Sequence, residues 1–389
     1  MNANEIVDEL YRVGFEDELS TDTDLHSVIL ANLFQVPETL LWSKIHTLLP
    51  NKPNMTLLEF TVVRFLVDMC MRHHAASGNS PKVEIWGEYR ASLYSSSELI
   101  QSGLYAYSGM KLLSNHNHHY LLDHEPIDDG SELSIAKIYT FSMSSYNYLL
   151  KAVSQSMGRV LANMCTQTEA LVLDTSLGLV MLILGSLPPG TCPLIDFTQN
   201  GNDFIAYTRG YLRTYTAILH HVRNSPFEWP CPPTNCPALP FFVEILQFID
   251  THSSQLGAAD EALMIKDAFA ILARNVYTAS VSLNPDYYYY IFCLMNDGFW
   301  DLVYAQQPLA LSWLNVLAAY AQLFKFYYIR DQNIWVDYMD WYRAWHGHSF
   351  AWDEPLYQVI VEQGFVVDDY ALLRSFNPLG STTIPQLLQ

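Results

Sequence analysis

The chain has 389 residues, of which half are apolar and 14% are aromatic, so it is long enough to bury a large core. It carries 40 acidic residues against 20 basic ones, which gives a formal net charge of −20 at pH 7. Such a surface repels nucleic acids and anionic lipid, because binding to either depends on Lys and Arg side chains. No run of Lys or Arg interrupts this balance, so we expect no direct contact with nucleic acid.

Helical periodicity dominates the chain. Apolar residues recur three and four positions apart in six segments, residues 24–36, 38–49, 56–74, 95–113, 168–184 and 260–280. Long alternating patterns typical of strands are missing, and the breaks between segments are rich in Pro, Gly and Asn. We therefore predict an all-α protein, with residues 1–55 as a helical N-terminal extension and residues 56–389 as one compact helical domain.

Two helix starts have a recognisable signal. Thr56 precedes an apolar run and is followed three positions later by Glu59, and Thr166 stands in the same relation to Glu169. In this pattern, the capping box, each of the two side chains accepts a hydrogen bond from the backbone of the other residue. We predict that a helix begins at each of these threonines.

The sequence contains no membrane-spanning or secretory signal that we can identify. The N-terminal segment "MNANEIVDELYRVG" is acidic and lacks an apolar core. The most apolar run, residues 176–187, is too short to cross a bilayer, and we predict that it forms a core helix. We expect a protein without a membrane span, located in the cytoplasm, or in the nucleus if it is a regulator.

The six cysteines are sparse and lack the paired short spacings of a zinc site. We interpret them as reduced thiols of an intracellular protein. Only Cys231 and Cys236 are close together, in the proline-rich segment "CPPTNC". A reversible disulfide and an inert loop both remain open there, and we favour the loop.

Two histidine-rich segments raise the question of a metal. In "NHNHHYLLDHE", His119 and Asp123 would share one face of a helix, a spacing that can hold a metal ion. The segment lies before "PIDDGS", where a solvated loop is the better prediction, and "HGH", with His346 and His348, has the same status. We predict no metal site.

The motifs of several common enzyme classes are missing. The chain has no G-x-S-x-G, G-x-G-x-x-G, P-loop or H-E-x-x-H pattern. This argues against a standard serine hydrolase, a dinucleotide-dependent enzyme, a nucleotide hydrolase or a zincin. We expect no cofactor.

Four consecutive tyrosines stand in "NPDYYYYIFCLMNDGFW", residues 284–300. Residues 284–286 are a natural helix start, with a proline in the first turn and an aspartate at the positive end. On a helix the four tyrosines fan around the circumference, so they cannot all line one site. The predicted rows are Tyr287 with Ile291 and Leu294, and Tyr288 with Phe292 and Met295. We expect a packed helix in which Tyr287 is the first candidate to offer a hydroxyl to a ligand.

Aromatic residues are the strongest functional signal. Tyr and Trp carry polar tips that need partners when buried, and a core built with many of them suits a cavity for a large apolar ligand with a few oxygens. Core packing is the competing interpretation, and for any single residue it is the better one. The predicted ligand-binding residues are Tyr105, Tyr146, Tyr148, Trp313, Tyr320, Trp341 and Trp345, and the predicted catalytic residues are Tyr107, Arg209, Tyr287 and His346. For Arg209, bracing a loop is an equally good interpretation.

Several segments, read in order between residues 56 and 360, together resemble a known family. They are residues 57–69, the "EIW…KLL" segment 84–113, residues 139–157, the segment "CTQTEALVLDTSLGLVMLILGS", the loop 193–215 that includes Arg209 and Gly210, residues 299–326, and the Trp-rich segment 335–352. Their order and spacing are similar to the C-terminal regulatory domain of fungal zinc-cluster transcription factors, of the type that controls sterol uptake. The resemblance implies an all-α fold that encloses a hydrophobic pocket, which in the sterol regulators takes a sterol.

The chain departs from that family at its start. The family's DNA-binding unit is a basic segment with six cysteines, whereas residues 1–55 are acidic and contain none. We therefore expect a ligand-binding half that stands alone. Either the reading frame is truncated or the pocket has acquired another function, and we favour the second.

Two functions from different classes follow. The first is a cofactor-free fungal enzyme of natural-product biosynthesis, a pericyclase such as a hetero-Diels–Alderase, acting on a bulky terpenoid, sterol or polyketide-like molecule. The alternative is a sterol- or terpenoid-sensing regulator without its own DNA-binding unit; a passive carrier is a third. We lean towards the enzyme, because a pericyclic reaction needs no nucleophile, metal or redox centre. A homodimer is an oligomeric state that we keep open.

Overall fold

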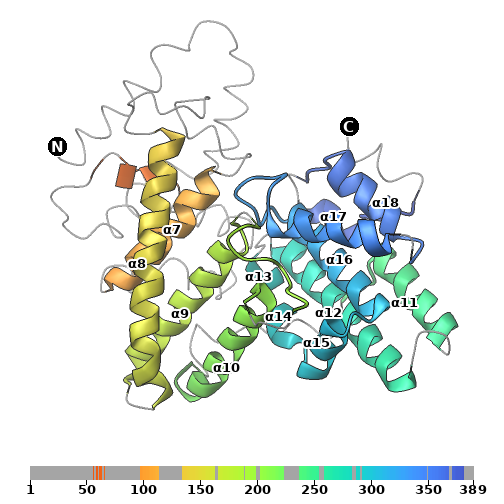
Figure 1. Cartoon of the computed structure of the whole chain (residues 1–389), viewed down its shortest axis with the longest axis horizontal. Helices are drawn as coiled ribbons and strands as arrows, with labels where there is room; N and C mark the ends of the chain where they lie inside the picture. Colours follow the sequence, from red (N-terminus) through yellow and green to blue (C-terminus); the bar gives the residue numbers. More distant parts are fainter. Residues whose placement is uncertain are drawn as a thin grey trace, which may run out of the picture. The chain divides into compact units, whose positions relative to one another are not determined.

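The computed structural model is helical throughout the part of the chain that it describes (Figure 1). It describes residues 56, 58–59, 61–63, 65, 97–113, 134–162, 165–187, 189–198, 202–222, 236–253, 258–282, 286–289, 291–347, 349–367 and 370–380. Of these residues, 76% are helical and none lies in a strand. The prediction of an all-α protein is confirmed.

The described residues group into two compact units. Unit 1 takes its residues from 1–183 and 218–228, and unit 2 takes its residues from 184–217 and 229–389. Two helices, α9 (Gln167–Leu184) and α10 (Phe204–Val222), have residues in both. The predicted boundary between the extension and the main domain, after residue 55, lies outside the described residues and stays a prediction.

Unit 1 is built on α7 (Glu98–Leu113), α8 (Ile135–Leu161) and most of α9. Helices α7 and α8 cross and pack against each other (Figure 1). Gly109 of α7 makes the close approach possible, because a Cβ at that position would overlap the Ser142 side chain of α8, and a Cβ at Gly103 would collide with Leu179 of α9. The segments of α7 and α9, in which apolar residues recur three and four positions apart, are therefore helices as predicted, and their apolar faces meet.

Both predicted capping boxes are present. The Thr56 backbone N–H donates to Glu59 Oε2 at 3.0 Å, and the Glu59 N–H donates to Thr56 Oγ1 at 3.1 Å. The corresponding distances at the start of α9, between Thr166 and Glu169, are 2.8 and 3.2 Å. Reciprocal capping satisfies two backbone donors that a helix start would otherwise leave unpaired.

Helix α9 also contains the apolar run that we predicted to be a core helix. Among the described residues, it is the one helix long and apolar enough to cross a membrane by length and composition alone. However, 61% of that window is buried inside the protein. A core helix of a globular protein has the same properties, and this agrees with the prediction.

Unit 2 is a cluster of helices around α16. Its elements are α11 (Pro240–His252), α12 (Ala259–Ser282), α13 (Asp286–Tyr289), α14 (Ile291–Leu294), α15 (Asp297–Tyr304), α16 (Pro308–Leu323), α17 (Ile334–His346), α18 (Asp353–Tyr357), the π-helix η4 (Gln358–Glu362) and the 3-10 helix η5 (Tyr370–Arg374). Helix α16 packs against α12, α15, α17, α18 and η4 (Figure 1). Every residue from Leu309 to Leu323 is buried, as expected for a helix that is apolar on all sides.

The described residues of the tyrosine run and of the segment after it are helical, in α13 and α14. The chain leaves the helical conformation before α15, where Asn296 is extended and its side chain accepts from the Phe299 N–H at 2.8 Å. The row Tyr288, Phe292 and Met295 is buried, whereas the other row combines the buried Ile291 with Leu294, which is 38% exposed. The second of the two predicted rows is therefore the one that is buried throughout. The side chain of Tyr287, our first candidate donor, lies outside the described residues.

Candidate functional site

Three indole and phenol groups lie in the core of unit 2 without a hydrogen-bond partner among the described residues. They are the Nε1–H groups of Trp300 and Trp313 and the hydroxyl of Tyr320. All three side chains are 0% exposed. A buried donor that lacks a partner costs about 1–3 kcal/mol, and native cores contain few such groups. Their concentration on α15 and α16 marks this part of the core as the candidate site.

Helix α16 sets the positions of two of these donors. Its start is fixed by Gln307, whose side chain accepts from the Ala310 N–H at 2.7 Å, and by Pro308 in the first turn. Trp313 and Tyr320 are seven residues apart and therefore share one face of the helix, about 10 Å apart along its axis.

Aromatic side chains surround these donors. The Trp313 ring packs edge-on against Phe299 at 4.7 Å and against Trp300 at 5.8 Å, measured between ring centroids. The Tyr320 ring stacks on Phe242 of α11 at 5.5 Å and meets Phe376 edge-on at 5.8 Å. Burial raises the pKa of Tyr320 well above its usual value. Tyr320 therefore stays protonated at neutral pH and acts as a donor.

One member of the tyrosine run, Tyr288, lies near Tyr320. The Tyr288 hydroxyl donates to the Leu317 carbonyl of α16 at 2.6 Å. Burial raises the pKa of Tyr288, and the neighbouring hydroxyls of Tyr320 and Tyr289 raise it further. Gly185 makes room for Tyr289, since a Cβ there would overlap the Tyr289 hydroxyl. The run thus places one phenol group beside Tyr320, and that group is already engaged with the backbone.

A second polar group on α16 is fully partnered. Ser312 donates to Asp353 Oδ1 at 2.9 Å and accepts from the Trp352 Nε1–H at 2.8 Å. The other carboxylate oxygen of Asp353 accepts from the Tyr342 hydroxyl and from the Phe350 N–H, both at 2.9 Å. Burial and the Asp353 carboxylate raise the pKa of Tyr342. This network holds α18 against α16 and α17 and leaves none of these groups free for a ligand.

His346, a predicted catalytic residue, lies next to this network. It ends α17, and its ring stacks on Tyr342 at 5.7 Å and lies 5.6 Å from Trp341. Trp341 itself packs against Phe197 at 4.8 Å. The predicted ligand-binding residue Trp345 is 74% exposed and is therefore a surface residue.

Arg209 braces two helices. Its guanidinium pairs with Asp297 in the first turn of α15, and its side chain is 19% exposed. Beside it, Asp203 caps α10 by accepting from the Ala206 N–H at 2.6 Å, and both of its oxygens lie 2.9 Å from the Tyr304 hydroxyl. Arg209 lowers the pKa of Asp297 by its hydrogen bond and its charge. The contacts correspond to the bracing interpretation, which we considered equal to ligand contact.

The remaining predicted residues belong to unit 1. Tyr105, Tyr107 and Tyr146 are buried, whereas Tyr148 is 46% exposed and its hydroxyl donates to Glu98 at 3.4 Å. The Lys111 ammonium lies 5.9 Å from the centre of the Tyr107 ring. The predicted site residues are thus divided between two units, and Trp313 and Tyr320 are the ones that coincide with the candidate site.

Sequence reasoning missed Trp300 as a donor and Asn315 as a polar group in the middle of α16. Asn315 Oδ1 has no partner among the described residues and lies on the side of α16 away from Trp313. An amide within "PLALSWLNVLAAYAQL" was a visible signal, because such a group stands out in an apolar helix.

Metal ligands do not gather in the described part of the chain. No group of three His, Cys, Asp or Glu side chains there could hold a metal ion. The histidine-rich segment 115–125 and His348 lie outside the described residues, so the predictions made for them stay predictions.

Comparisons with protein-family models, with curated proteins and with solved structures found no match. The resemblance of residues 56–360 to the regulatory domain of zinc-cluster transcription factors therefore stays a prediction.

Proposed function

We propose that the protein binds a bulky, largely apolar molecule with a few oxygen atoms in the core of unit 2, and that it converts this molecule without a cofactor. The observation that carries the proposal is the set of three fully buried donors, Trp300, Trp313 and Tyr320, that have no partner among the described residues. A terpenoid, sterol or polyketide-like ligand would offer carbonyl or hydroxyl oxygens to these donors and hydrocarbon to the aromatic rings around them.

The donors favour electrophilic activation rather than acid–base catalysis. The pKa of Tyr320 is raised by burial, so the phenol is a poor proton acceptor at neutral pH and a permanent donor. A hydrogen bond from Tyr320 or from an indole to a carbonyl oxygen withdraws electron density from a conjugated enone. In an apolar core this interaction is stronger than in water.

Such activation is what a cycloaddition requires. An enone polarised at its oxygen reacts faster with a diene or polyene, and no nucleophile, metal or redox centre takes part. Holding the two partners in a reactive geometry can supply roughly 7–11 kcal/mol of the barrier in the best cases. A pericyclase, for example one that catalyses a hetero-Diels–Alder reaction, is therefore the enzyme class that we propose.

Mass spectrometry of compounds that co-purify with the protein is the first experiment. We expect an apolar compound with one to a few oxygens, bound more weakly by Tyr320→Phe than by the unchanged protein. The purified protein is then incubated with a candidate polyene and a candidate enone of that compound class. Stereocontrol that the buffer reaction lacks supports the enzyme, and only the spontaneous product mixture contradicts it.

The alternative is a ligand sensor. It is favoured by the resemblance of residues 56–360 to the regulatory domain of sterol-responsive factors. A sensor would bind the same kind of ligand at the same donors, and the ligand would be recovered unchanged. Turnover measured with the co-purifying compound separates the two functions.

A further inference from the structure

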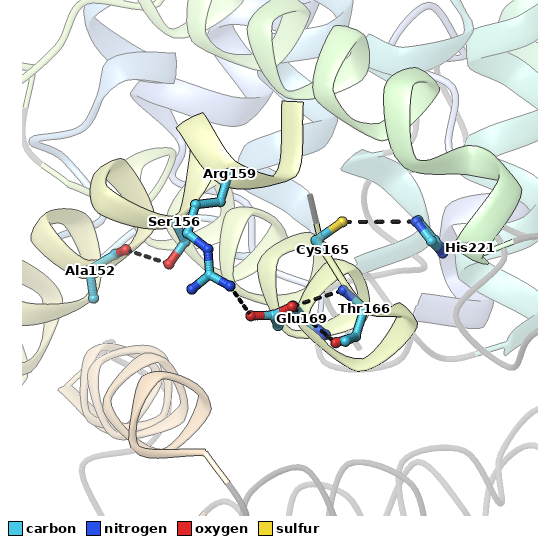
Figure 2. Close-up of polar contacts among 7 residues, drawn as sticks. All are labelled: Ala152, Ser156, Arg159, Cys165, Thr166, Glu169 and His221. Atoms are coloured by element: carbon cyan, nitrogen blue, oxygen red, sulfur yellow. Dashed lines mark hydrogen bonds and ion pairs between the residues drawn. The ribbon is translucent and has the colours of Figure 1, made fainter. Parts of the chain in front are cut away.

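A thiol and an imidazole meet in unit 1, where α9 begins and α10 ends. Cys165 Sγ lies 3.8 Å from His221 Nε2, and both residues are half-buried (Figure 2). Cys165 directly precedes Thr166, which caps α9, and His221 lies in the last turn of α10. The proposed function uses neither residue, since the core donors belong to unit 2.

Local contacts hold this pair in place. The Gln167 side chain donates from Nε2 to the His221 carbonyl at 3.1 Å and so ties the end of α10 to the start of α9. The capping box between Thr166 and Glu169 fixes the backbone that follows Cys165 (Figure 2). Glu169 is fixed in turn by Arg159, at 2.9 Å. The geometry is therefore set by the folded backbone on both sides of the thiol.

We propose that Cys165 is a nucleophile and His221 its general base, and that the pair adds covalently to neutral α,β-unsaturated carbonyl compounds. Nucleophile and base within hydrogen-bond reach are the arrangement that activates a thiol. His221 Nε2 accepts the thiol proton while Sγ bonds to the β-carbon, and the electron pair of the double bond moves to form an enolate. The proton then passes from His221 to the α-carbon. The product is a thioether, with no leaving group and no change of oxidation state.

The net charge of the protein and the bonding state of its cysteines favour neutral α,β-unsaturated carbonyl compounds. The net charge of −20 disfavours anionic reagents such as acidic peptide disulfides. Cys165 and Cys192 form no disulfide bond in the structure, so the Cys165 sulfur is available for reaction. A neutral carbon electrophile meets neither obstacle.

The test uses N-ethylmaleimide, a small neutral reagent of this class, on the full chain. Labelling of each cysteine is followed in time by peptide mass spectrometry. We expect Cys165 to react at least about tenfold faster than Cys236. Burial raises the pKa of Cys236 and raises that of Cys192 to about 12, so these thiols serve as internal references.

The variant His221→Gln tests the base. It should slow labelling of Cys165 about tenfold and leave Cys236 unchanged. The matched control is His220→Gln, because the exposed His220 ring lies directly beside His221, at 3.9 Å between ring centroids. This control should keep the rate of the unchanged protein.

Two results would overturn the proposal. One is equal labelling rates at Cys165 and Cys236, and the other is a Cys165 rate that His221→Gln does not change. Urea gives a test that needs no variant: the advantage of Cys165 must disappear on unfolding, because it comes from the folded pair. An advantage that survives in urea would reflect local sequence alone and would also contradict the proposal.

Discussion

Buried polar groups on α16 fall into two kinds. Ser312 belongs to a network in which Asp353, Tyr342 and Trp352 all have partners at 2.8–2.9 Å. The tips of Trp313 and Tyr320, in contrast, have no partner among the described residues. A completed network fixes the packing of three helices, whereas unpartnered donors lower stability until a ligand accepts from them. The difference separates groups that hold the fold from groups that can recognise a ligand.

The largest effect should come from Asp353→Ala. Its carboxylate accepts from Ser312, Tyr342 and the Phe350 backbone, so its removal leaves two buried donors and one half-buried donor unpaired. We expect unfolding in urea to show a loss of about 3–5 kcal/mol. Asp331→Ala is the control, since that side chain is 87% exposed and should change stability little. A small loss for Asp353→Ala would mean that the network does not support the fold.

A pair of tyrosine variants gives the sharpest comparison. Tyr342→Phe removes a donor to Asp353 and should cost about 1–2 kcal/mol. Tyr320→Phe removes a hydroxyl that has no partner among the described residues, and should leave the free energy of unfolding unchanged or raise it by up to about 1 kcal/mol. Both values come from urea unfolding of the ligand-free protein. If Tyr320→Phe destabilises as much as Tyr342→Phe, the Tyr320 hydroxyl has a structural partner and the two kinds of group on α16 are alike.

The same variants should reverse their order in ligand binding. Tyr320→Phe removes a donor that we assign to the ligand, and we expect affinity for the co-purifying compound to fall about tenfold, the equivalent of one hydrogen bond. Tyr342→Phe should leave affinity within about twofold, because its hydroxyl stays with Asp353. Titration calorimetry or fluorescence of the core tryptophans measures both. Equal losses would contradict the assignment.

The smallest effect concerns α15, which carries Trp300. Arg209 lowers the pKa of Asp297, so this pair stabilises the fold above the ordinary carboxyl pKa, and the contribution is lost as pH falls through the lowered value. Asp297→Asn should therefore lower Tm slightly at pH 7 and not at pH 2. Because Asp297 is exposed, the effect should also shrink in high salt. A Tm difference that persists at pH 2 would show that the carboxylate charge is not its source.

Part of this structure was predictable because it is local. The capping boxes at Thr56 and Thr166, the helices α7, α9 and α12, and the buried row from Tyr288 to Met295 follow from residues three or four positions apart. For the candidate site, the sequence predicted the type of residue but not the arrangement. Periodicity indicated that Trp and Tyr are buried in the core, and two of the predicted residues, Trp313 and Tyr320, lie in the candidate site.

The sequence by itself determined an all-α protein, where several of its helices begin, and the abundance of aromatic polar tips in its core. Only the tertiary structure decided which tips are satisfied, because their partners come from distant positions. The Trp335 Nε1–H reaches the Gly185 carbonyl 150 residues away, while Trp313 reaches no acceptor among the described residues. Cys165 likewise finds its imidazole 56 residues along the chain. No local pattern fixes such distances, since they depend on how the helices pack.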